Sequence, residues 1–206
     1  ITKKKASHIL CMNEDAAKVL KLNKSQYTIC PSVATEDAKK EGIHKNNFTL
    51  ISAGRFVPLK GFDVTIKSFA KFYHGLNHVN RAEVKLHLVG SGPFELQLKS
   101  LANELNIGDA IQWTNWIDRN ELQKLYASSS VFLFPSYEGA GMVVAEAMVH
   151  SLPVVCWNNS GPGAFVNKQS ALKVNMNKSY DESIDTFATI LNRLYTDDAY
   201  WKYETI

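Results

Sequence analysis

Short apolar runs alternate with amphipathic segments along most of this chain, and this alternation limits its fold more than any other feature. Five runs are rich in β-branched and aromatic residues, and several are apolar almost throughout, as expected of strands covered on both faces. These predicted strands span residues 48–55, 84–90, 110–115, 131–136 and 152–157. Strands and helices that alternate at this spacing predict βαβ units, and therefore a Rossmann-like three-layer α/β/α fold with a parallel sheet.

The segments between the predicted strands carry apolar residues at helical spacing. Two such stripes consist of Phe62, Ile66, Phe69, Ala70 and Tyr73 in one segment and of Leu96, Leu98, Leu101 and Leu105 in the next. A third segment carries Leu122, Leu125 and Tyr126, and Asp118 is placed to cap its helix. Ligands of such sheets bind at the carboxyl ends of the strands, so functional residues are expected in the loops there.

Residues 1–45 differ from the rest and are predicted to form a separate N-terminal segment. Residues 6–13 and 26–32 resemble two strands around a short helix, and the polar stretch 35–47 resembles a linker. The main domain would then span residues 46–206. The chain begins with Ile-Thr-Lys-Lys-Lys rather than with methionine, as though it were cut from a longer protein.

The composition is that of a folded globular domain. The chain has 206 residues, of which 45% are hydrophobic and 21% charged, which suits one sizeable domain and excludes disordered and low-complexity classes. A net charge of +3 gives no reason to expect nucleic-acid binding. Residues 1–60 hold 11 basic and 5 acidic groups. Such a front end could face a membrane surface or a partner, although lysines in solvent explain it more simply.

Three widely spaced cysteines, Cys11, Cys30 and Cys156, each lie in or beside an apolar stretch and lack the spacing of metal ligands. We predict that they are small buried residues in a reducing, cytoplasmic setting. Neither an Asp-x-Asp pair nor a His/Asp cluster indicates a metal site. No apolar run approaches the roughly 18 residues that a transmembrane helix needs.

The loop at residues 53–63 carries two cations at the carboxyl end of a predicted strand. Arg55 follows Gly54, and Lys60 precedes Gly61 and a predicted helix. A guanidinium and an ammonium on one loop can hold two phosphate oxygens, and a helix start beside them adds free N–H groups. Two solvated cations on a glycine turn would look the same, so this loop alone does not decide the function.

A second glycine turn, at residues 89–94, falls short of the dinucleotide-binding fingerprint. Its third glycine position holds Glu95, and no acidic residue stands at the matching end of the second strand. Tight strand-to-helix turning explains it adequately, and binding of a nicotinamide dinucleotide is the weaker alternative. The turn at residues 158–166 could bring amides to a ligand or be a plain turn.

The segment at residues 134–157 is the most informative. Glu138 follows an apolar strand and precedes Gly139-Ala140-Gly141, and Glu146 lies one to two turns into the next predicted helix. The glycines let a ligand approach the backbone and leave the first amides of the helix unblocked. Paired carboxylates suit vicinal hydroxyls such as those of a sugar or ribose. Taken singly, Glu138 could be an acid stabilised by the helix N-terminus, and Glu146 an exposed helix residue.

In their order and spacing, these motifs resemble the C-terminal donor-binding domain of the retaining glycosyltransferases of family 4, also called group 1. The loop at 53–63 is similar to the family's G-R-x₄-K-G sequence, and residues 111–136 to the stretch that leads to its E-x₇-E motif. Residues 138–148 are similar to that motif, and Leu-Pro-Val-Val followed by Gly-Pro continues it. The resemblance implies one half of a GT-B fold, in which two Rossmann-like domains face each other across a cleft.

The resemblance also implies roles for individual residues. Arg55 and Lys60 would hold the diphosphate of a nucleotide sugar and, with Glu138 at the donor sugar, form the catalytic set. Glu146 would bind the ribose hydroxyls. The other implied donor-binding positions are Gly54, Trp116, Ile117, Gly139, Ala140, Gly141 and Met142, of which Trp116 and Ile117 would lie near the nucleobase. No metal or other cofactor would be needed, because cations and helix-end amides can stabilise the leaving diphosphate.

The sequence departs from the family pattern at several positions. Ala140 stands where the family usually has Phe, and Asn115 where it often has Gly. Residues 149–151 replace the usual Ala-Cys-Gly, and Ala164 stands where Glu is usual, which leaves open a ligand contact by that loop. None of these changes removes the diphosphate pair or the two glutamates.

The implied activity is transfer of a hexosyl-type group from a nucleotide-diphosphate sugar to an acceptor hydroxyl, with retention. Residues 1–45 would be the tail of an N-terminal domain and its linker, so this chain would be inactive alone. The acceptor, a glycan or glycolipid of polysaccharide biosynthesis, would bind through the missing domain, in the cytoplasm and with peripheral membrane association. Two alternatives stay open: a sugar-nucleotide epimerase or phosphorylase on the same fold, and a non-catalytic nucleotide-binding module.

Overall fold

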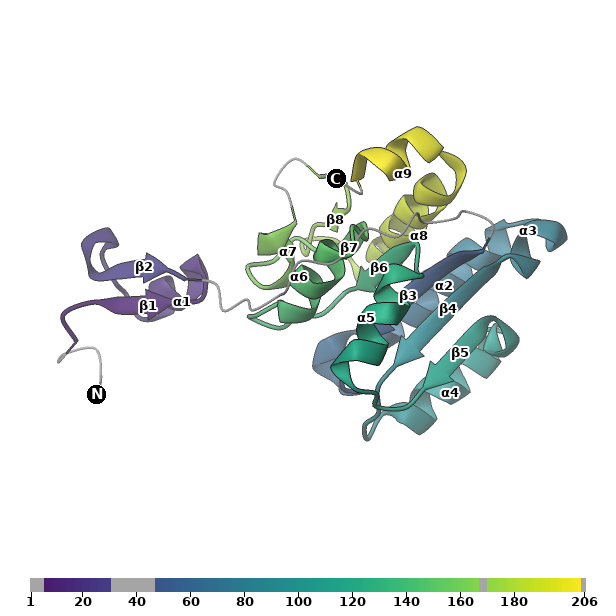
Figure 1. Cartoon of the computed structure of the whole chain (residues 1–206), viewed down its shortest axis with the longest axis horizontal. Helices are drawn as coiled ribbons and strands as arrows, with labels where there is room; N and C mark the ends of the chain where they lie inside the picture. Colours follow the sequence, from purple (N-terminus) through teal and green to yellow (C-terminus); the bar gives the residue numbers. More distant parts are fainter. Residues whose placement is uncertain (1–5, 31–46, 167–169, 205–206) are drawn as a thin grey trace.

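A parallel sheet of six strands forms the centre of the main domain (Figure 1). The computed structural model describes residues 6–30, 47–166 and 170–204. The strands are β3 (Phe48–Ala53), β4 (Val84–Val89), β5 (Ile111–Thr114), β6 (Val131–Phe134), β7 (Val154–Trp157) and β8 (Lys173–Val174). Their order across the sheet is β5-β4-β3-β6-β7-β8, and every neighbouring pair is parallel. The predicted three-layer fold is confirmed.

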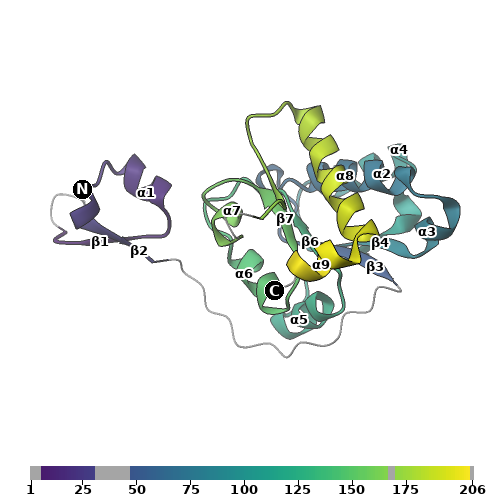
Figure 2. The same ribbon diagram turned by 90° about the horizontal axis from the view of Figure 1, so that it is seen from above.

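Helices cover both faces of this sheet, as Figure 2 shows. One face packs against α2 (Phe62–Gly75), α4 (Glu95–Glu104) and α8 (Tyr180–Thr196), and the other against α5 (Arg119–Ala127), α6 (Met142–Val149) and α7 (Pro162–Phe165). The sheet therefore divides the core in two, and successive residues of β3 pack on its opposite faces. Leu50 packs with the α2 side and Ile51 with the α5 side. The strands are apolar almost throughout because both of their faces are covered.

The helices largely follow their predicted stripes. Phe62, Ile66, Phe69 and Ala70 are buried in α2, and the Asp118 side chain caps α5 by accepting a hydrogen bond from the Glu121 N–H. Leu96 is a correction, because its side chain is 82% exposed whereas Leu98 is buried. Leu96 precedes Leu98 by two residues, which is about 200° around a helix, so Leu96 points away from the sheet. The domain also contains two short α-helices, α3 (His78–Ala82) and α9 (Asp198–Glu204), and two 3₁₀ turns, η3 (Pro58–Lys60) and η4 (Gly108–Ala110).

The predicted strands are longer than the observed ones, and β3, β4 and β6 each end early at a glycine or proline. Gly54 and Gly90, with φ of +154° and +142°, turn the chain directly after β3 and β4. Pro135 follows β6, and its missing N–H cannot extend a ladder. Strand β8 was not predicted, since a two-residue strand leaves no readable pattern.

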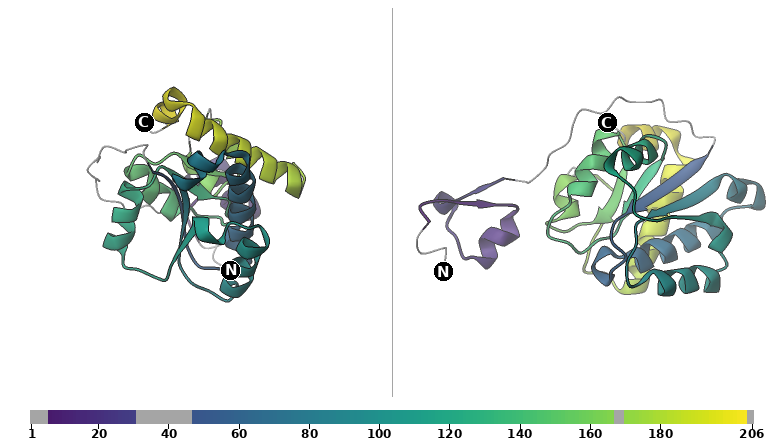
Figure 3. Two further views of the ribbon diagram at one scale, coloured as in Figure 1. Left: turned by 90° about the vertical axis from the view of Figure 1, so that its right-hand side faces the viewer. Right: turned by 60° about the horizontal axis from the view of Figure 1, so that its bottom comes forward.

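The N-terminal segment contains two strands around a short helix, as predicted. Strand β1 (Ile9–Cys11) pairs in parallel with β2 (Tyr27–Ile29), and between them lie α1 (Glu14–Val19) and the 3₁₀ turn η2 (Lys24–Gln26). Figures 1 and 3 show this segment beside the end of the main domain that carries α6 and α7. The predicted linker lies almost wholly outside the described residues, and the domain boundary at residue 45 stays a prediction.

The cysteine prediction holds for two of three positions. Cys11 and Cys156 are buried, and burial raises the pKa of the Cys156 thiol to about 12. Cys30 is exposed, because it follows the end of β2 in a two-stranded sheet too small to cover it. Among the described helices, none combines the length and apolarity that crossing a bilayer would require.

Candidate functional site

The sheet order fixes where a ligand would bind. The chain enters at the central strand β3, builds β4 and β5 on one side, and returns to add β6, β7 and β8 on the other. In an open parallel sheet, the crevice at such a reversal lies at the carboxyl ends of the two central strands, here β3 and β6. Those two ends carry the loops with Arg55, Lys60 and Glu138.

The loops after β3 and β6 touch through their backbones. Tyr137 N–H donates to the Leu59 carbonyl at 2.9 Å, and the Ser136 hydroxyl donates to the same oxygen at 3.2 Å. Gly61 has φ +67°, and a Cβ there would overlap the Pro135 carbonyl oxygen. Only glycine permits both this conformation and this contact, so Gly61 sets the distance between the two loops.

Lys60 and Glu138 form an ion pair across the crevice. Both side chains are largely buried, with 19% of each exposed, and the Lys60 ammonium lies 5.3 Å from the centre of the Phe134 ring. An anion that reaches Lys60 would compete with Glu138, and the released carboxylate could then accept hydrogen bonds from hydroxyls. Arg55 is exposed, and its side chain forms no hydrogen bond or ion pair with another described residue.

Four of the predicted site residues line one cavity of about 300 Å³. It is bounded by Gly54 after β3, by Trp116 and Ile117 after β5, and by Glu146 on α6. Trp116 is 74% exposed, so its ring offers a free face for stacking. An aromatic ring and a carboxylate in one cavity suit a nucleoside, whose base can stack while its ribose hydroxyls donate to the carboxylate.

A buried tyrosine, Tyr126, lies in the core on the α5 and α6 side of the sheet. The Tyr126 hydroxyl is buried and has no hydrogen-bond partner among the described residues. Burial and the Glu146 carboxylate raise the pKa of Tyr126, which therefore stays protonated at any physiological pH.

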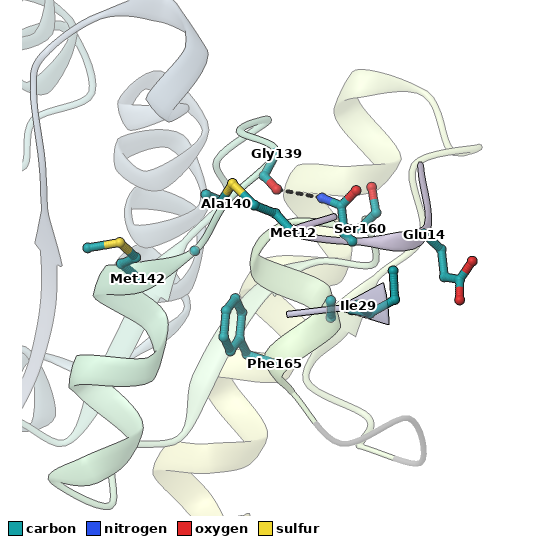
Figure 4. Close-up of a pocket in the computed structure, with 11 residues that line it drawn as sticks. Met12, Glu14, Ile29, Gly139, Ala140, Met142, Ser160 and Phe165 are labelled. Carbon is teal, nitrogen blue, oxygen red and sulfur yellow. Dashed lines mark hydrogen bonds between the residues drawn. The ribbon is translucent and has the colours of Figure 1, made fainter. Parts of the chain in front are cut away.

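The other four predicted positions line a second cavity, of about 360 Å³ (Figure 4). Gly139, Ala140, Gly141 and Met142, here called the glycine loop, form one wall of it. The N–H groups of the last three make no hydrogen bond to a described residue. They stand at the start of α6, where free amides and the helix dipole favour an anion or a sugar oxygen.

The opposite wall of the second cavity comes from the N-terminal segment, which sequence analysis did not assign to the site. Met12, Asn13, Glu14 and Ile29 contribute there. The Asn13 side chain donates to the Gly139 carbonyl at 2.6 Å, and Figure 4 marks this bond at Gly139. The available signal was Asn13 as a helix cap before an amphipathic stretch, but a cap does not reveal a contact 126 residues away.

Ser160 in the loop after β7, with Ala164 and Phe165 in α7, completes the second cavity. The loop after β7 lies closely against the glycine loop and the residue before it, since a Cβ at Gly161 would overlap the Glu138 carbonyl oxygen and lie 3.2 Å from the Ala140 carbonyl oxygen. Ala164 lines the cavity, but its methyl group can provide only an apolar contact. The predicted residues thus follow the carboxyl ends of the strands, four in each cavity and two in the ion pair, while Arg55 lines neither cavity. In the described part of the chain, no group of three or more His, Cys, Asp or Glu could hold a metal ion.

Comparison with known proteins points to one family. Residues 33–203 match the family described as "Glycosyl transferases group 1". An uncharacterized glycosyltransferase of Haemophilus influenzae is 41% identical over 122 residues, which cover 57% of this chain and 31% of that protein. A GDP-mannose-dependent phosphatidylinositol monomannoside mannosyltransferase of Mycobacterium tuberculosis is 26% identical over 151 residues, which cover 69% of this chain and 38% of that protein. The chain spans 31% to 39% of the length of three such curated relatives.

Solved structures show the same fold at lower identity. The pneumococcal O-GlcNAc transferase GtfA, solved with UDP and GlcNAc, superposes with a TM-score of 0.78 at 20% identity and covers 99% of this chain and 42% of its own. The C-terminal domain of LpcC, a group 1 family protein of Francisella tularensis, gives a TM-score of 0.64 at 18% identity. The match covers 77% of this chain and 80% of that domain. At these identities the likeness concerns the fold, and it matches the predicted half of a GT-B architecture.

Proposed function

The chain belongs to the group 1 glycosyltransferases, and we propose that it supplies the donor-binding half of a retaining enzyme. The proposed reaction moves a hexosyl group from a nucleotide-diphosphate sugar to an acceptor hydroxyl. One observation carries the proposal: Arg55, Lys60 and the free amides of the glycine loop all lie at the carboxyl ends of β3 and β6. This arrangement offers several positive groups to one diphosphate and leaves the first cavity for the nucleoside.

The proposed chemistry depends on charge that develops at the leaving group. As the glycosidic bond to phosphate breaks, negative charge builds on the diphosphate, and groups already aimed there stabilise it without reorganising. Lys60 would exchange Glu138 for a phosphate oxygen, and Glu138 would turn to the hydroxyls of the donor sugar. Arg55 would add a second cation from the same loop, and no metal or cofactor takes part.

The proposed partners are a nucleotide sugar and a glycan or glycolipid acceptor that binds through an N-terminal domain. Relatives support this choice, since the mycobacterial enzyme is named for GDP-mannose and a phosphatidylinositol mannoside, and GtfA was solved with UDP and GlcNAc. We place the protein in the cytoplasm, at the inner face of the membrane, where the lysines of residues 1–45 could meet anionic lipids.

Calorimetric titration of the chain with UDP, GDP, ADP and their sugar conjugates tests donor binding. We expect one diphosphate to bind selectively, and Arg55→Ala to weaken it about ten- to a hundredfold, as loss of a charge-assisted contact predicts. Arg55→Lys keeps the charge and should lose less. Titration in EDTA should give the same affinity, because the proposal includes no metal. A well-folded chain that binds none of these nucleotides would contradict the donor role, and binding without transfer by a full-length protein would favour the non-catalytic alternative.

Glu146→Gln tests the assignment of the first cavity. The carboxylate would accept from both ribose hydroxyls, whereas an amide offers one oxygen, so binding of the preferred nucleoside diphosphate should weaken about tenfold. The 2′,3′-dideoxy nucleotide supplies the control, because the wild-type chain should bind it weakly and the variant should bind it no worse than the wild type does. A variant that distinguishes the two nucleotides as strongly as the wild type would place the ribose elsewhere.

A further inference from the structure

We infer that Asn13 is a positioning residue for the glycine loop: its side-chain amide holds the Gly139 carbonyl and thereby fixes the direction of the Ala140 N–H. The inference rests on the proposed function, because it assigns that N–H to an oxygen of the donor's sugar or phosphate. It gives the N-terminal segment a part in donor binding, although none of its residues belongs to a donor motif.

Both ends of the Asn13 amide are engaged. Its nitrogen donates to the Gly139 carbonyl at 2.6 Å, and its oxygen accepts from the Ala16 N–H at 2.9 Å as the cap of α1. Because the cap requires an acceptor, it orients the amide so that the nitrogen faces Gly139. The α1 helix start therefore holds the donor group in place before any ligand arrives.

The Gly139 carbonyl has one hydrogen-bond donor among the described residues, the Asn13 amide. The carbonyls of Glu138 and Ala140 lie against Gly161, whereas Gly139 between them is exposed and a Cβ there would meet nothing within 4 Å. The peptide unit between Gly139 and Ala140 is planar and trans, so its C=O and N–H point in opposite directions. A bond that fixes the carbonyl toward Asn13 therefore turns the Ala140 N–H away from it. That N–H has no acceptor among the described residues.

A second observation places the start of α1 beside the site, because Glu14 lines the second cavity together with Ser160. The neighbouring Ser160 hydroxyl and the Lys18 ammonium hold the pKa of Asp15 below its ordinary value. Ser160 lies in the loop after β7, which itself touches the glycine loop at Gly161. The start of α1 thus bonds to the glycine loop through Asn13 and lines the same cavity as Ser160 (Figure 4).

Asn13→Ser separates the two roles of this side chain, which caps α1 and donates to the Gly139 carbonyl. Serine still caps a helix, so α1 should persist, but its short hydroxyl cannot replace the amide donor to Gly139. We expect calorimetry to show about tenfold weaker binding of the preferred nucleotide sugar, among UDP-glucose, UDP-GlcNAc, GDP-mannose and ADP-glucose. Binding of the matching nucleoside monophosphate, which fills only the first cavity, should not change.

Asn77→Ser is the matched control. Asn77 caps α3 in the same way, by accepting from the Asn80 N–H at 2.9 Å, and α3 lies outside both cavities. This variant should bind every nucleotide as the wild type does and show a similar thermal midpoint to Asn13→Ser. Equal binding of the nucleotide sugar by Asn13→Ser and wild type, or an equal loss for sugar and monophosphate, overturns the inference and leaves the proposed function intact. A wild-type chain that binds no nucleotide overturns both.

Discussion

Replacing Lys60 with alanine in a full-length enzyme should lower turnover by about a hundred- to a thousandfold, the loss typical of removing one preorganised charge donor. The ammonium is largely buried, held against the Phe134 ring and the Glu138 carboxylate. Water cannot readily take its place, and the leaving diphosphate would lose its central cation. Because the effect belongs to the transition state, kcat should fall more than the affinity for the donor.

Lys71→Ala is the matched control for this experiment. Lys71 also forms an ion pair, with Asp185, but both side chains are more than half exposed and lie outside the site. An exposed pair contributes little to stability, so turnover of this variant should stay within about twofold of the wild type. Steady-state kinetics with the natural donor decide between the two results. Near wild-type turnover for Lys60→Ala would refute the role of Lys60 at the diphosphate.

Gly61→Ala should destabilise the chain by about 3 kcal/mol, a large loss of stability for a single added methyl group. Alanine at φ +67° costs about 1 to 2 kcal/mol by itself. The added Cβ would also overlap the Pro135 carbonyl, which is backbone and cannot rotate away. The loops after β3 and β6 would have to separate, so donor binding should weaken together with stability. Urea unfolding followed by circular dichroism measures the loss.

Gly75→Ala provides the contrast for the same chemical change. Gly75 is the last residue of α2, and a Cβ there would meet nothing within 4 Å. Alanine favours a helix over glycine, so stability should stay the same or rise by up to about 1 kcal/mol. Similar unfolding curves for Gly61→Ala and Gly75→Ala would show that the two loops can move apart without cost.

The elements of the main domain could be predicted because their signals are local. Apolar runs and helical stripes report burial directly, and the loop motifs stand where β3 and β6 end. The errors occurred where a pattern had too few residues to show whether a side chain faces the core or the solvent. Leu96 belongs to a leucine-rich stretch but points outward, and Cys30 follows an apolar strand in a sheet too small to cover it.

The contacts that assemble the site could not be predicted from local patterns. Lys60 and Glu138 are 78 residues apart. They form an ion pair because β6 pairs with β3 on the side opposite β4, which brings the loops after β3 and β6 together. The sequence indicated that both residues belong to one site but not that they neutralise each other. Asn13 shows the same limit, since its spacing reveals a helix cap and nothing of Gly139.

Backbone contacts at glycines hold the loops of the site, whereas the exposed side chains there are not part of those contacts. At Gly61 with Pro135, Gly90 with Gly54, and Gly161 with Glu138, backbone meets backbone with no room for a side chain. The frame that presents the cations and amides is therefore held by main-chain atoms, which are the same whatever residues surround them. Trp116 and Met142 project from this frame and are exposed. Substitution at such positions could therefore change the preference for a nucleobase or a sugar without moving the main-chain groups of the proposed phosphate site.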